Sequence, residues 1–280
     1  MNSETLPTAL VETALPLRGF FLVNQRLLLL AAGLILPIVA LLCLEFCVRR
    51  GLVPARLLPA PSQIGEVLLD MYRDGTLATH IGISTLRVLL GFVVGSILGI
   101  LVSSLVGFHR CAEVLLDTTI QALRGIPALA WVPLLLIWLG IDEAPKITLI
   151  AMGAFFPIYL NLQAGIRNVD RKLIEVGVIL GLDHMQVIRR ILIPAALPHL
   201  FTGLRQGLSL AWMFVVAAEM IAATKGIGFL LTDGRETSRP DITLAAIFLL
   251  ALAGKLSDAL LRRFESSLLS WRDIYQPQTP

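Results

Sequence analysis

Long apolar runs separated by short polar segments are the feature that most limits what this chain can fold into. Six runs each hold about 20 or more mostly apolar residues, the length that a helix needs to cross a bilayer. They cover residues 27–48, 87–107, 114–140, 147–166, 201–223 and 242–261. Only 15% of the residues are charged, whereas ordinary soluble domains carry about 25%. The sequence therefore predicts an all-α membrane protein with about six transmembrane helices and short amphipathic helices between them.

The polar segments divide the chain into a tail, a membrane domain and a second tail. Residues 1–26 are expected to form an N-terminal tail, 27–262 the transmembrane domain and 263–280 a C-terminal tail. Lys and Arg residues are almost evenly shared between the two sides, but one dense cluster lies in residues 167–200. By the positive-inside rule, this cluster places that loop and both termini in the cytoplasm.

The segment between the fourth and fifth runs predicts two short amphipathic helices joined by a glycine elbow. Asp170 is a candidate cap for the first helix, and Gly181 ends it. Asp183 caps the second helix, with Gln186 completing a capping box, and Pro194 is expected to end it. Such an object fits a groove in a partner protein.

The same segment also carries a recognisable pattern. It reads Glu175-Val176-Gly177, then Gly181, then after nine residues Ile191-Leu192-Ile193-Pro194. This resembles the EAA loop of the membrane-spanning permeases of ABC importers that depend on a binding protein. That pattern is Glu-Ala-Ala, three residues, Gly, nine residues and Ile-x-Leu-Pro. The chain departs from it at Val176, Gly177 and Ile193, which are small or apolar exchanges.

Further segments are similar to the aliphatic sulfonate branch of these permeases, and together they cover about residues 58 to 271. They include Leu58-Pro59-Ala60-Pro61-Ser62, Gln121-Ala122-Leu123-Arg124, Trp138-Leu139-Gly140-Ile141-Asp142-Glu143, Phe156-Pro157-Ile158-Tyr159 and Gly165-Ile166-Arg167. The resemblance implies a homodimer in the bacterial inner membrane, two cytoplasmic ABC ATPase subunits and a periplasmic solute-binding protein. It leaves the imported anion open among sulfonates, taurine and nitrate.

The resemblance also implies which residues contact the ATPase. They are Glu175, Gly177, Gly181, Arg189, Ile191 and Pro194. The chain contains no Gly-x-x-x-x-Gly-Lys-Ser/Thr loop, so ATP and Mg²⁺ are expected on the partner, and this chain is expected to bind no cofactor and to catalyse no reaction.

Charged residues inside the runs are candidates for the translocation path, because they are costly in a membrane. Arg124 lies beside the Gly125–Pro127 break and either faces an anion path or pairs with Asp117. Glu219 either serves a gate or pairs with an arginine of an outer loop.

Two other interior cations have simpler expected roles. Lys255 is expected to neutralise Asp258, three residues further on, and Arg205 to extend toward the cytoplasmic interface. Residues 224–240 are expected to form a loop.

The second run carries small residues at every fourth position. Gly91, Gly95 and Gly99 form part of this stripe, which lets two helix backbones approach closely in lipid. We therefore assign them to helix packing.

Two other classes of protein remain as alternatives. A secondary transporter driven by an ion gradient would carry acidic residues at mid-span and a pair of broken helices, whereas only the third run is clearly broken. A membrane enzyme is the other alternative, although no metalloprotease motif and no acid–base pair of carboxylates is present. The net charge of +3 fits loops beside an anionic leaflet, not nucleic-acid binding, and no metal-ligand spacing occurs.

Overall fold

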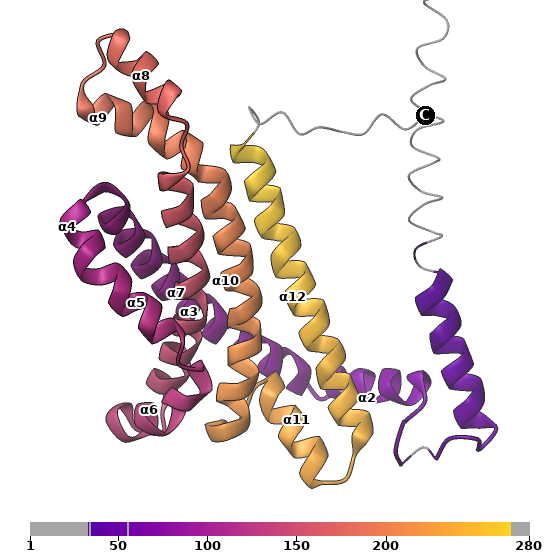
Figure 1. The fold of residues 1–280 in the computed structure, drawn as a ribbon. Coiled ribbons are helices and arrows are strands. Elements are labelled where there is room, and N and C mark those ends of the chain that lie inside the picture. Colours follow the sequence, from indigo (N-terminus) through magenta and orange to yellow (C-terminus); the bar gives the residue numbers. More distant parts are fainter. Residues whose placement is uncertain (1–32, 34, 55, 270–280) are drawn as a thin grey trace, which may run out of the picture. The chain divides into compact units, whose positions relative to one another are not determined.

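The computed structural model describes residues 33, 35–54 and 56–269, and every regular element within them is a helix (Figure 1). The described residues before and after the Glu66–Val67 junction form two compact units. The elements in chain order are α2(Pro61–Arg73), α3(Thr76–Phe108), α4(Arg110–Ala112), η2(Glu113–Asp117), α5(Thr118–Arg124), η3(Ala128–Trp131), α6(Val132–Leu139), α7(Glu143–Arg167), α8(Arg171–Ile179), α9(His184–Val187), η4(Ile188–Leu192), α10(Ile193–Ala222), α11(Ile227–Glu236) and α12(Pro240–Leu268).

Four of these helices are long and apolar enough to cross a membrane. They are α3, α7, α12 and the continuous helix His184–Ile221, which joins α9, η4 and α10. The bent pair Arg110–Arg124 and Ala128–Leu139, with an angle of 91° between its halves, makes a fifth if it counts as one span. The first predicted run, residues 27–48, lies partly outside the described residues, and its described part from 35 onward is helical. The all-α membrane fold is therefore confirmed.

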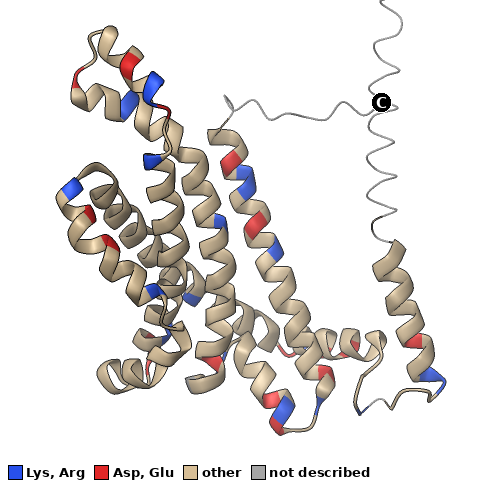
Figure 2. Cartoon of the chain, viewed as in Figure 1, with Lys and Arg blue, Asp and Glu red and all other residues tan. Residues whose placement is uncertain are grey.

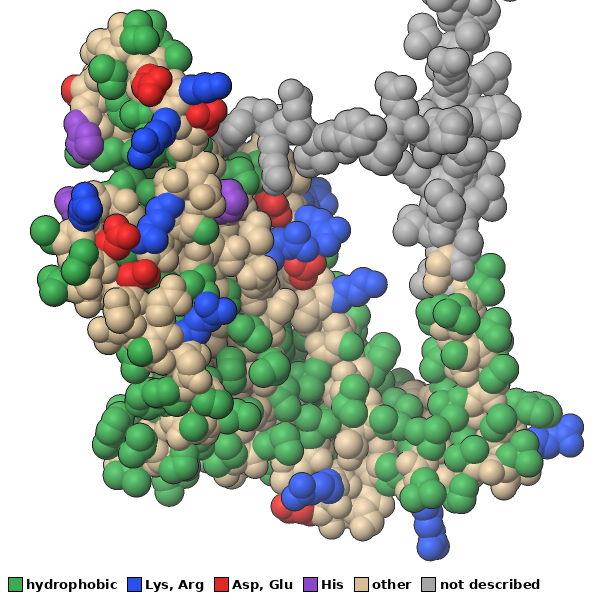
Figure 3. Space-filling model, viewed as in Figure 1, with side chains coloured by type: hydrophobic (Ala, Val, Ile, Leu, Met, Phe, Trp, Pro, Cys, Tyr) green, Lys and Arg blue, Asp and Glu red, His purple; other side chains and the backbone are tan. Residues whose placement is uncertain are grey.

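Helix α7 forms the centre of the second unit, with α3 and α10 packed along it (Figure 1). The buried core joins Leu149 and Ile150 of α7 to Ala211 and Val215 of α10 and Ala246 of α12. Hydrophobic side chains cover the middle of the bundle in the space-filling view, while charged side chains gather toward its ends (Figures 2 and 3). This distribution is the one expected of a bundle that faces lipid at its middle.

The glycine stripe of α3 lies against α7. A Cβ on Gly91 would lie 2.6 Å from the Cβ of Ile150, and one on Gly95 would overlap the carbonyl oxygen of Ala151. A Cβ on Gly99 would also crowd α7, at 3.1 Å from an isoleucine side chain. The absence of side chains at these positions is what allows the two backbones to approach.

The structure corrects two predicted element boundaries. Helix α3 begins at Thr76 rather than at residue 87, after Gly75 adopts a φ of 72°. The first turns of α3 contain polar residues, which are unusual in a membrane-spanning helix, but these residues form the buried contacts described below. Residues 224–240 are not simply a loop, since they contain α11.

The prediction that Pro194 ends the second amphipathic helix was wrong. The π-helical turn η4 precedes it, and the N–H of Ile193 donates to the carbonyl of Ile188, one residue further back than in an α-helix. Proline is tolerated in the first turn of a helix, and Pro194 lies there in α10. The helix therefore runs on from the polar segment into the fifth span.

The expected Lys255–Asp258 pair was also wrong. Asp258 instead accepts hydrogen bonds from Arg205, with Nε at 2.8 Å from Oδ1. Arg205 therefore links α10 to α12 rather than extending alone to the interface.

Candidate functional site

The first candidate site is the helical hairpin α8–α9, which projects from one end of the bundle (Figure 1). Asp170 begins α8 by accepting a hydrogen bond from the backbone N–H of Lys172 at 2.9 Å. The hairpin turns at Gly181, whose φ of 76° favours glycine. Across the turn, the N–H of Leu182 donates to the carbonyl of Gly177 at 3.0 Å. This bond is the one that closes a Schellman motif, so the elbow follows from the local sequence.

The second arm of the hairpin begins with a complete capping box. The N–H of Gln186 donates to Asp183 at 2.6 Å, and Asp183 N–H donates to the side chain of Gln186 at 3.1 Å. The predicted caps of both arms are therefore confirmed. Because α9 continues into α10, this arm is rigidly attached to a membrane span.

Among the predicted coupling residues, Gly177 and Ile191 lie on the inner side of the hairpin. Gly177 is buried, and a Cβ there would lie 2.6 Å from Cδ1 of Ile191. Pro194 is partly buried at the base, whereas Glu175 and Arg189 are exposed. The structure thus separates residues that hold the two arms together from residues that face outward.

The outer surface of the hairpin is apolar although it lies beyond the ends of α7 and α10. Val178, Ile179, Leu180 and Met185 are each more than half exposed, and Ile179 reaches 83%. An exposed apolar cluster of this kind is typical of a surface that contacts another protein or a membrane.

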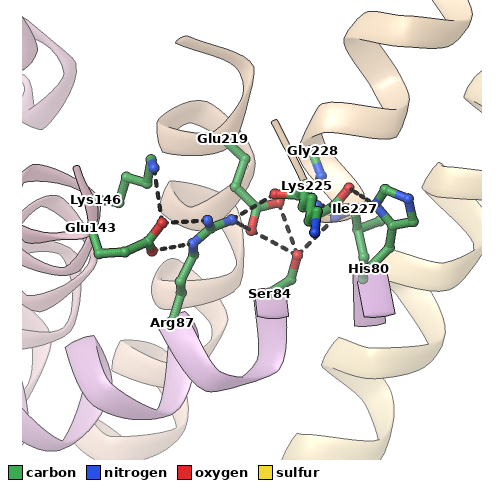
Figure 4. A network of polar contacts seen from close by, with 10 residues as sticks. His80, Ser84, Arg87, Glu143, Lys146, Glu219, Lys225, Ile227 and Gly228 are labelled. Atoms are coloured by element: carbon green, nitrogen blue, oxygen red, sulfur yellow. Dashed lines mark hydrogen bonds and ion pairs between the residues drawn. The ribbon is translucent and has the colours of Figure 1, made fainter. Parts of the chain in front are cut away.

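The second candidate site is a buried polar network at the end of the bundle opposite the hairpin (Figure 1), drawn from close by in Figure 4. At its centre is Glu219 of α10, whose side chain is fully buried. Its carboxylate accepts hydrogen bonds from Ser84 Oγ at 2.7 Å, from Arg87 Nη1 at 2.8 Å and from the N–H of Gly228 at 2.8 Å. A buried carboxylate is stable only when paired and hydrogen-bonded, and here both conditions are met.

Arg87 extends the network to α7. Its Nε and Nη2 atoms donate to the two carboxylate oxygens of Glu143 at 2.5 and 2.6 Å. Lys146 donates to the same carboxylate at 3.1 Å. Arg87 therefore joins α3, α7 and α10 through two carboxylates.

The glycine-rich turn before α11 closes the network. The N–H of Ile227 donates to Ser84 Oγ at 2.8 Å, and that of Gly226 donates to His80 Nδ1 at 3.0 Å. A Cβ on Gly226 would overlap the carboxyl group of Glu219, and its φ of 129° also favours glycine. Glycine is needed at positions 226 and 228 because the side chain of Glu219 lies where a Cβ would be, and the N–H of Gly228 contacts its carboxylate directly.

Sequence reasoning found Glu219 but not its partners. The arginine that pairs with it is Arg87 of α3, not one from an outer loop. His80, Ser84 and Glu143 were missed because they lie at predicted span boundaries, where polar residues are ordinary.

Arg124 lies apart from both sites. It is exposed at the end of α5, just before the break at residues 125–127. Its predicted alternative partner, Asp117, instead accepts hydrogen bonds from Tyr159 Oη at 2.7 Å and Gln163 Nε2 at 2.8 Å. The Asp117–Arg124 pair is therefore wrong, and a role in the anion path stays a prediction. Within the described part of the chain, no cluster of His, Cys, Asp and Glu is placed to hold a metal ion.

Comparisons with known sequences identify a family that matches most of this chain. Residues 91–270 match the family described as binding-protein-dependent transport system inner membrane component. An aliphatic sulfonates transport permease protein SsuC of Bacillus subtilis (strain 168) is 40% identical over 87% of this chain and 88% of its own length. The SsuC protein of Escherichia coli (strain K12) is 38% identical over 90% of this chain and 95% of its own length.

A solved structure supports the fold. The crystal structure of an amino acid ABC transporter with histidines superposes with a TM-score of 0.57, covering 74% of this chain and 98% of that chain at 16% identity. The family match covers more than half of the chain, and it includes both the hairpin and most of the polar network. This chain belongs to the family of binding-protein-dependent transport system inner membrane components.

Proposed function

We propose that this membrane-spanning permease subunit imports aliphatic sulfonates, delivered by a periplasmic binding protein and driven by cytoplasmic ABC ATPase subunits. The names of both SsuC relatives support the substrate class, since the chain covers nearly all of their length. Members of the family are transport components, and ATP and Mg²⁺ are assigned to the separate ATPase.

The observation that carries the coupling proposal is the exposed apolar hairpin. Its outward side chains match the helix-in-groove mode, in which an apolar helical face enters a groove of the partner. Glu175 and Arg189 lie exposed on the same hairpin and provide charges at the rim. Since α9 is continuous with α10, a displacement of the hairpin by the ATPase moves a membrane span directly.

The remaining assignments follow from placing the hairpin on the cytoplasmic side of the membrane, where it contacts the ATPase. The hairpin and both termini are placed in the cytoplasm, and the polar network faces the periplasm. Residues 1–26 and 263–280 are assigned as cytoplasmic tails around a permease domain of residues 27–262. A second copy of the chain completes the pathway in the bacterial inner membrane.

Charge reversal at Glu175 tests the docking surface. The tagged full-length chain is co-expressed with its ATPase and purified in mild detergent, and the ATPase retained per permease is measured. Glu175→Lys is expected to lose most of the ATPase. Glu236→Lys, at an exposed glutamate of α11 at the opposite end, is expected to retain it.

Uptake in proteoliposomes tests the function itself. Radiolabelled ethanesulfonate is expected to enter only with ATP, the ATPase and the binding protein together. Wild-type uptake by Glu175→Lys would contradict the coupling role. Uptake driven by an ion gradient without ATPase would instead favour a secondary transporter, and preference for taurine or nitrate would change the substrate class.

A further inference from the structure

Two buried cations of the polar network hold a carboxylate that is itself exposed. The Nε and Nη2 edge of Arg87 and the Nζ of Lys146 all contact the carboxylate of Glu143 (Figure 4). The side chains of Arg87 and Lys146 are each 7% exposed, whereas that of Glu143 is 53% exposed. The cations are therefore fixed in the bundle, and the anion that neutralises them faces outward.

The edge of Arg87 that contacts Glu143 has no other role in the network. Its Nη1 atom is already used by Glu219 and by the backbone carbonyl of Lys225, each at 2.8 Å. A guanidinium edge offers two parallel donors, which match two oxygens of a carboxylate or of another oxyanion. Lys146 adds a third donor on the same side.

The charges of the network also allow the carboxylate of Glu143 to be replaced by another anion. With Glu143 in place, two cations face two carboxylates and the network is neutral. With Glu143 turned toward solvent, Arg87 and Lys146 face Glu219 alone, and a positive charge is left without a counterion. A buried charge without a partner is strongly unfavourable, so an entering anion is stabilised where Glu143 was.

The surroundings suit an anion that carries an aliphatic group. Lys146 also lines a small cavity together with Val132, Leu136 and Ile221. Lys146 therefore contacts the carboxylate of Glu143 and also borders an apolar surface.

We infer that Arg87 and Lys146 form an oxyanion site, that Glu143 occupies it as an internal substitute ligand, and that the sulfonate group of the substrate displaces Glu143. The identity of the anion rests on the proposed function, whereas the site rests on the geometry of the network. In the proposed orientation the site faces the periplasm, where the binding protein releases its anion.

The test measures anion binding to the full-length chain in lipid nanodiscs, without ATPase or binding protein. Thermal unfolding is followed in sodium ethanesulfonate and in sodium chloride of equal ionic strength, and the apparent Kd is taken from the sulfonate-specific rise in Tm. Removing the competing carboxylate in Glu143→Gln is expected to tighten ethanesulfonate binding by about tenfold or more. Glu143→Asp, which keeps the charge but shortens its reach, is expected to give a smaller gain. Adding Lys146→Gln to Glu143→Gln is expected to remove the gain.

A matched variant separates this site from a general effect of a freed arginine. Glu113→Gln releases Arg167, which pairs with Glu113 at 2.7 Å at the hairpin end. It is expected to leave ethanesulfonate binding at the wild-type level. An equal gain in Glu113→Gln, or no sulfonate-specific gain in either Glu143 variant, would overturn the inference. Binding is measured without transport, so a gain in binding with no ATP-driven uptake would contradict only the proposed function.

Discussion

The buried pair of Arg87 and Glu219 gives a quantitative test of how this bundle is held together. Removing one partner of a buried ion pair costs about 3–5 kcal/mol, because the other charge stays buried and uncompensated. Glu219→Gln preserves the volume of the side chain and leaves Arg87 paired with Glu143, which is 53% exposed. The expected loss of unfolding free energy is therefore at the lower end, about 3 kcal/mol.

Arg87→Gln is expected to cost more than Glu219→Gln. It leaves Glu219 with no cation in a site where its side chain has no exposed surface. It also removes the bonds to Glu143 and to the carbonyl of Lys225. The expected loss is about 5 kcal/mol, the upper end of the same range.

The double variant, Arg87→Gln with Glu219→Gln, separates the interaction energy between the two charges from the contributions of their other contacts. With both charges removed, neither is left unpaired, so the expected loss is no more than about 5 kcal/mol, well below the sum of about 8. The difference is a coupling energy of at least about 3 kcal/mol. We propose to measure it by titrating the purified chain with SDS in mixed micelles and following unfolding by far-ultraviolet circular dichroism.

A second ion pair provides the control. Arg205 and Asp258 form a similar contact, but each side chain is 34% exposed. The same cycle of glutamine and asparagine variants is expected to give a coupling below about 1 kcal/mol, as for exposed pairs. The reasoning would be refuted if the losses of unfolding free energy for the Arg87 and Glu219 variants added to within about 0.5 kcal/mol. A coupling energy no larger than that of the control pair would refute it too.

Four further predictions concern the helix contacts and the pathway. Gly95→Leu is expected to separate α3 from α7 and to abolish recovery of folded protein, measured by size-exclusion chromatography in detergent. Gly177→Ala is expected to be tolerated, because only the terminal methyl of Ile191 must move, whereas Gly177→Leu is expected to open the hairpin and release the ATPase in the co-purification assay. Asp183→Ala removes the capping box and is expected to destabilise the hairpin by about 1 kcal/mol, seen as faster amide hydrogen exchange in its second arm. Arg124→Gln is expected to reduce sulfonate uptake while assembly is retained, and unchanged uptake would exclude Arg124 from the path.

The hairpin was predictable because its determinants are local. Asp170 and Asp183 each cap a helix within three residues of their own position, and Gly181 sets the turn through its own φ angle. None of these contacts depends on which helices pack against the hairpin. A pattern of a few neighbouring residues was therefore sufficient to predict both arms and the elbow.

Pro194 shows where local reasoning fails. Proline prevents one backbone hydrogen bond, and the usual result in a helix is a break. Here the π-helical turn η4 shifts the hydrogen-bond pattern just before Pro194, and the proline falls in the first turn of the next helical segment. Residues of the hairpin pack against η4, so the shift depends on contacts that a proline rule does not consider.

The polar network depends on contacts between residues far apart in the sequence, yet one physical constraint limits which cations can pair with Glu219. Glu219 lies near the C-terminal end of α10, and a buried carboxylate needs a cation at the same depth in the bundle. The first half of α3, the start of α7 and the turn between α10 and α11 lie at that end, and they carry Arg87, Lys146 and Lys225. The constraint leaves several candidate cations and does not choose among them. The choice follows from packing: the glycine stripe brings α3 against α7, and α10 packs against both, so that Arg87 reaches Glu219 and Glu143 together. Close packing of backbones in the apolar middle of the bundle thus determines which charges meet at its end.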